Sequence, residues 1–95
     1  MVVKFKGERF LGKTEVLAVG KDGVPRRLKP RRPGRFEWSD FPSQELCFAI
    51  LKELVGPVDA EKYCDELKRR FPAKLGDRWE LPAGQVLRWL EEKAG

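Results

Sequence analysis

The side chains with the clearest potential chemistry form a basic run followed by an aromatic residue. Residues 24–35 contain six cations and no acid. Lysine and arginine neutralise phosphates and release their counterions, and arginine also favours planar phosphate and carboxylate partners. An aromatic side chain beside such a run can stack a base. The candidate anion-binding residues are therefore Arg26, Arg27, Lys29, Arg31, Arg32 and Arg35, together with Phe41 at the following turn.

The distribution of charge permits two interpretations of this basic run. Residues 1–35 hold 11 Lys/Arg and 3 Asp/Glu, whereas residues 36–95 hold 9 Lys/Arg and 12 Asp/Glu. Such asymmetry can mark an anion-binding surface. The alternative is a solvated loop whose arginines pair with carboxylates of the second half. No RRM, zinc-finger or helix-turn-helix signature is present to favour nucleic acid further.

Catalytic and metal-binding patterns are missing from the sequence. The chain has no histidine, so general acid–base chemistry would fall to carboxylates, lysines or Tyr63. Its acids lack a recognisable metal spacing, and no glycine-rich phosphate loop occurs. Cys47 and Cys64 lie among apolar residues and are expected in the core as free thiols. We therefore expect that the protein is not an enzyme and that it has no cofactor and no metal site.

The first half of the chain has the pattern of short strands. Asp22-Gly23 predicts a tight hairpin turn, and Pro25 predicts an edge strand because proline lacks a donor. Phe36 and Trp38 alternate with Glu37 as a half-buried extended segment would, and we expect both aromatics in the core. The predicted strands are Val2–Phe5, Glu15–Val19 and Val24–Lys29.

The second half has the pattern of three helices, over about 42–55, 59–71 and 82–93. Gly56-Pro57 is expected to stop the first helix, and Trp79 and Trp89 to pack the third against the second. The predicted fold is α+β, with a small antiparallel sheet of about three N-terminal strands packed against three C-terminal helices. We expect one domain over 1–95, with 1–38 mainly strands and basic loop and 42–93 mainly helical.

Several motifs resemble those of a known family. They are Lys6-Gly7-Glu8-Arg9, Phe36-Glu37-Trp38 followed by a polar turn and an apolar helix, and Trp79-Glu80-Leu81 with Trp89-Leu90. The chain is similar to a family of small bacterial and phage domains of unknown function. That family's turn after Phe-x-Trp is rich in glycine and serine, whereas this turn, residues 39–43, lacks glycine and looks shorter. The resemblance implies the fold and the domain limits, but no activity, cofactor or catalytic residue.

Two functional hypotheses follow. The first is a non-enzymatic binding module that contacts nucleic acid or another polyanion through the basic loop. The alternative is a protein–protein interaction or self-association module, in which the loop serves only solubility and stability. Six Phe and three Trp in 95 residues motivate this alternative, since a partner could cover part of that surface.

Composition also bears on the cellular location of the protein and on the growth temperature of its organism. No apolar stretch approaches the length of a membrane span, and Lys4 and Lys6 interrupt the first apolar run, so we expect a cytoplasmic protein without a membrane partner. Charged residues make up 37% of the chain, which has no Asn and few Gln. This composition resembles that of thermophile proteins.

Overall fold

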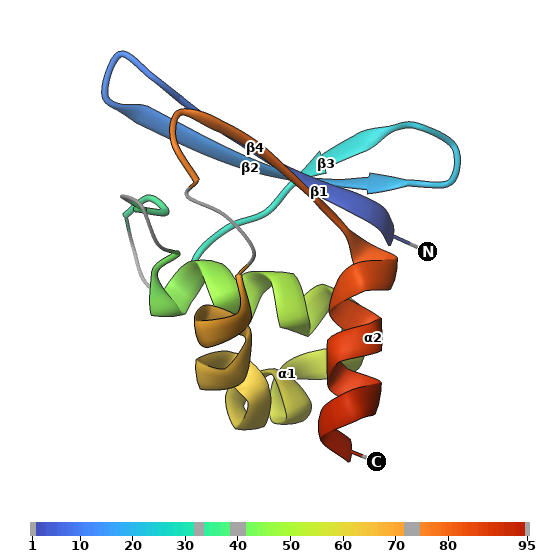
Figure 1. Cartoon of the computed structure of the whole chain (residues 1–95). Coiled ribbons are helices and arrows are strands. Elements are labelled where there is room, and N and C mark those ends of the chain that lie inside the picture. Colours follow the sequence, from blue (N-terminus) through green and yellow to red (C-terminus); the bar gives the residue numbers. More distant parts are fainter. Residues whose placement is uncertain (1, 32–33, 39–41, 72–74, 95) are drawn as a thin grey trace.

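A computed structural model of the chain describes residues 2–31, 34–38, 42–71 and 75–94 (Figure 1). Four strands form one antiparallel sheet of order β3-β2-β1-β4, and both helices lie on one side of it. The elements are β1 (Val2–Phe10), β2 (Lys13–Gly20), β3 (Pro25–Arg27), α1 (Gln44–Arg70), β4 (Arg78–Pro82) and α2 (Ala83–Ala94). The α+β class is confirmed, whereas the predicted numbers of strands and helices are wrong.

The hairpin of β1 and β2 is longer than the sequence predicted. It closes through Leu11 and Gly12, whose φ angles of 50° and 75° are those of a tight two-residue hairpin turn. Gly7, which follows the predicted end of the first strand at Phe5, lies within β1 opposite Val16. β1 therefore continues to Phe10.

The second hairpin has its turn at the predicted Asp22-Gly23, but β3 covers only Pro25–Arg27 of the predicted strand Val24–Lys29. Gly23 has a φ of 79°, and its N–H donates to the Gly20 carbonyl at 3.0 Å. The Asp22 carboxylate accepts from the Val24 N–H at 3.0 Å, which fixes the turn. β3, which begins at Pro25, forms the edge of the sheet, as a strand with a proline must.

Strand β4 was not predicted, and it changes the role of Trp79. The strand pairs with β1, so that Leu81 lies opposite Phe5 and Trp79 opposite Gly7. The Trp79 ring covers Gly7 so closely that a Cβ there would lie 2.1 Å from Cε2 of the indole. Trp79 also makes edge-to-face contacts with Trp38 and Phe71, at centroid distances of 5.7 and 5.9 Å. It therefore joins the sheet to the rest of the core instead of packing one helix against another.

The helical half contains two helices instead of three. The predicted stop at Gly56-Pro57 is a break within α1: Gly56 adopts a non-helical φ of 85° and ψ of 170°, and helical structure resumes after it, so α1 contains the first two predicted helices. The side chain of Ser43 caps its start by accepting from the Leu46 N–H at 3.2 Å. The third predicted helix corresponds to α2, and Trp89 lies there beside Leu67 of α1.

The core lies between the sheet and the helices. Phe5, Val16 and Leu81 of the sheet are fully buried, as are Ile50 of α1 and Val86 of α2. Phe36 and Trp38 are only 3% and 6% exposed, which confirms their expected burial. The Trp38 Nε1–H donates to the Gly76 carbonyl at 2.6 Å, so the polar end of this buried ring is satisfied.

Both cysteines are buried free thiols, as expected. Burial raises the pKa of Cys47 to about 12, and it also raises the pKa of Cys64. The Cys64 Sγ donates to the Gln44 carbonyl at 3.3 Å, a contact that requires the protonated thiol.

Replacing Gly7 with alanine should destabilise the fold. The new methyl would overlap the Trp79 ring, and overpacking of a core typically costs about 1–3 kcal/mol. Gly84→Ala is the matched control, because a Cβ at this position of α2 meets no atom within 4 Å. Chemical denaturation should place Gly7→Ala well below the wild type and Gly84→Ala at or above it. Equal stabilities would contradict the packing described.

The thiols should be unreactive in the native protein. At pH 8 the pKa of about 12 leaves Cys47 almost entirely protonated, so a disulfide reagent should label it only in denaturant. Because the pKa is raised on folding, the stabilisation it reflects is present below the unfolded value near 8.5 and is lost as pH rises above it. The free energy of unfolding should therefore fall between about pH 9 and pH 12. Rapid labelling of the native protein would contradict the burial of these thiols.

Candidate anion-binding site

Four of the predicted cations line one cavity. It has a volume of about 500 Å³ and lies between β2 and the segment that leads from β3 towards α1. Its described lining residues are Thr14, Glu15, Val16, Arg27, Leu28, Lys29, Pro30, Arg31, Gly34, Arg35 and Phe36. Among them, four cations face one carboxylate, Glu15.

The cavity exists because the segment from Leu28 to Trp38 is attached to the sheet near both of its ends. The Leu28 N–H donates to the Val16 carbonyl at 2.8 Å, and its side chain is buried. Towards the other end, the Thr14 hydroxyl donates to the carbonyl of buried Phe36. From Leu28 to Arg31 the chain leaves the sheet and runs towards α1 (Figure 1). The basic residues between the attachments therefore line a hollow.

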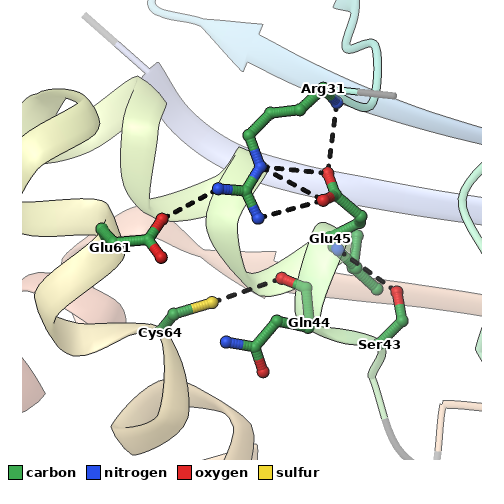
Figure 2. A network of polar contacts seen from close by, with 7 residues as sticks. Arg31, Ser43, Gln44, Glu45, Glu61 and Cys64 are labelled. Carbon is green, nitrogen blue, oxygen red and sulfur yellow. Dashed lines mark hydrogen bonds and ion pairs between the residues drawn. The ribbon is translucent and has the colours of Figure 1, made fainter. Parts of the chain in front are cut away.

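Arg31 attaches the same segment to α1 (Figure 2). Its guanidinium contacts Glu45 Oε1 at 3.0 Å through Nη2 and Glu61 Oε2 at 2.8 Å through Nη1. Its backbone N–H donates to Glu45 Oε2 at 3.1 Å, and its Cζ lies 3.7 Å from the centre of the Phe48 ring. The hydrogen bonds to Glu45 and then Glu61 raise the pKa of Arg31. Since Glu45 precedes the Gly56 kink and Glu61 follows it, Arg31 links both parts of the helix.

The other three cations of the cavity are less fully engaged. Arg27 donates through Nε and Nη2 to Glu15 at 3.1 and 2.9 Å, and Arg35 donates through Nη1 to the Gly12 carbonyl. A guanidinium carries five N–H donors, so both retain donors beyond these bonds. Lys29 is exposed and makes no hydrogen bond or ion pair with any residue that the structure describes.

The remaining predicted site residues do not join this cavity. Arg26 lies on the opposite face of β3 and pairs with Glu53 of α1, and that hydrogen bond raises its pKa. Arg26 thus resembles Arg31 in binding a helix carboxylate. Arg32 and Phe41 lie outside the described residues, so their predicted part in the site has no structural account.

Two neighbours of the cavity were not singled out by the sequence. Phe10 and Leu11, at the end of the β1–β2 hairpin, are 75% and 84% exposed. Arg35 contacts the same turn at Gly12, which places the hairpin end beside the basic segment. Phe-Leu-Gly between two strands is the signal that could have identified this exposed apolar end.

The described residues carry neither a metal-ligand cluster nor a membrane-spanning helix. In the part of the chain that the structure describes, no three His, Cys, Asp or Glu side chains are grouped as metal ligands. Neither of its helices is long and apolar enough to cross a membrane.

Truncation of Arg31 should loosen the basic segment. Arg31→Ala removes the contacts with Glu45, Glu61 and Phe48 at once, so the melting temperature should fall. Lys29→Ala removes a neighbouring cation without a partner in the described structure and should leave the melting temperature nearly unchanged. Thermal unfolding followed by circular dichroism compares the two. Equal melting temperatures would contradict the attachment through Arg31.

Comparison with known proteins gives a family but no characterised relative. A model described as a family of unknown function, DUF6166, matches residues 5–92. No curated protein matches the chain, and no solved structure matches it. The match extends from β1 into α2 and therefore includes both the sheet and the candidate site. The chain belongs to the DUF6166 family of unknown function.

Proposed function

We propose that the protein is a non-enzymatic binding module whose cavity receives phosphates of nucleic acid or of another polyanion. The observation that carries this proposal is the convergence of Arg27, Lys29, Arg31 and Arg35 on one cavity of about 500 Å³. Residues from β2, from β3 and from the following segment line it together. A cation cluster held in a concavity focuses its field on an anionic ligand.

The four cations divide into a support and a binding set. The guanidinium of Arg31 forms ion pairs with Glu45 and Glu61, and these contacts fix the position of the segment. Lys29, with the remaining donors of Arg27 and Arg35, supplies the contacts for a ligand. A segment fixed before binding loses less conformational entropy when the ligand arrives.

The chemistry of the cavity supports binding more than catalysis. Its one carboxylate among the described lining residues, Glu15, accepts two hydrogen bonds from Arg27 at Oε1, so it is ion-paired with a cation of the same cavity. The chain has no histidine to act as a base near neutral pH. The lining therefore offers donors to an anion and no group poised for proton transfer.

Binding should depend steeply on salt and on Lys29. Fluorescence polarisation with a labelled oligonucleotide should show affinity at about 50 mM salt that falls sharply by about 200 mM, because phosphate contacts release counterions. Lys29→Gln should weaken binding and reduce the salt slope by about 1. Lys62→Gln, which removes the same charge from an exposed position on α1, should leave both unchanged.

Two outcomes would contradict the proposal. Absent binding at low salt, or binding that ignores salt, would exclude a phosphate-binding cavity. Equal losses of affinity in Lys29→Gln and Lys62→Gln would show that net charge alone attracts the ligand and that the cavity does not bind it specifically.

The exposed hairpin end favours a second candidate, a protein–protein interaction or self-association module. Phe10 and Leu11 are neighbouring large apolar side chains, each at least three-quarters exposed. Such surface is often covered by a partner. Light scattering at about 100 μM tests self-association, and a strict monomer would remove that form of the alternative.

A further inference from the structure

A second cavity continues the first one towards the hairpin end. It has a volume of about 410 Å³ and is lined by Glu8, Phe10, Lys13, Thr14, Glu15 and Arg27. Thr14, Glu15 and Arg27 line both cavities. The two cavities therefore adjoin at these three residues, and together they are called the groove, which extends from Phe10 past Arg27 to Lys29.

The groove follows a part of β2 that β3 does not cover. β3 has three residues and pairs with Leu17, Ala18 and Val19. The bond from Leu28 to Val16 adds one further contact. In the described structure, Lys13–Glu15 has β1 on one side and no strand on the other, and Thr14 and Glu15 of this stretch line both cavities.

The two ends of the groove offer different chemistry. One end presents Lys29 and Arg35, and the shared middle presents Arg27. The hairpin end presents Lys13 beside Glu8 and the ring of Phe10, which is 75% exposed although it belongs to a strand. Phe10 is positioned by the two-residue turn that follows it and by its pairing with Lys13.

We propose that this groove binds a single strand of nucleic acid, with phosphates on Lys13, Arg27, Lys29 and Arg35 and a base stacked on Phe10. The inference rests on the proposed phosphate-binding function and names its substrate class. A ligand that alternates anionic groups with flat rings matches a groove that combines cations with an exposed aromatic ring. A base can stack on Phe10 only when it is unpaired, so the structure favours a single strand over a duplex or a simple polyanion.

The test compares three probes on the full chain. The first is a labelled oligothymidylate of about 12 nucleotides, the second an abasic strand of the same length, and the third a duplex of that length. The abasic strand keeps the phosphates and lacks the bases. The wild type should bind the oligothymidylate about tenfold more tightly than the abasic strand, and the duplex more weakly than the oligothymidylate.

Substitution of Phe10 isolates the stacking contact. Phe10→Ala should remove the preference for the oligothymidylate while leaving the affinity for the abasic strand and the salt slope unchanged. Phe10→Trp should retain the preference. Val58→Ala, at an apolar residue of α1 that is 81% exposed, is the matched control and should change neither affinity.

The failures of the two proposals are distinguishable. Equal, salt-dependent affinity for the oligothymidylate and the abasic strand would overturn the single-strand proposal and leave the phosphate site in place. A preference that survives in Phe10→Ala would also overturn it. Binding of none of the three probes would overturn the phosphate site itself, and the groove beside an uncovered strand edge would then suit an extended peptide.

Discussion

The attachment of the segment from Leu28 to Trp38 to both the sheet and α1 is the constraint on which the candidate site depends. Leu28 bonds to Val16, Phe36 accepts from Thr14, and Trp38 donates to Gly76. Arg31 adds the contacts with α1 between these points. Because the segment is held at its apolar residues and at one arginine, its remaining cations can line a hollow without holding the fold together.

Elements specified by local sequence were predicted well. The Asp22-Gly23 turn, the edge position of β3 and the break at Gly56-Pro57 all follow from the conformational limits of glycine and proline. β4 was missed because its five residues become a strand only by pairing with β1, far away in the sequence. The place of Gly7 within β1 was missed for the same reason, since the Trp79 ring that requires a glycine there comes from that strand.

The candidate site was predictable in composition but not in arrangement. The density of cations in residues 24–35 identified the correct part of the chain. Which of these cations are available to the cavity depends on carboxylates that folding brings near them. Arg26 pairs with Glu53 on the helix side of β3, and Arg31 pairs with Glu45 and Glu61. Phe10 gained significance only because the turn at Leu11 and Gly12 places it beside the basic segment. A charge pattern can locate a site, whereas the pairing of those charges requires the tertiary structure.

The central claim is that a ligand contacts this molecule along the groove beside β2. Amide chemical shifts of ¹⁵N-labelled protein, recorded during titration with oligothymidylate at low salt, test the location directly. The account predicts that the changes concentrate at Phe10, Lys13, Thr14 and Lys29 and spare α2, which lies on another part of the molecule. Changes centred on α2 or spread evenly over all exposed lysines and arginines, or no changes at all, would contradict it.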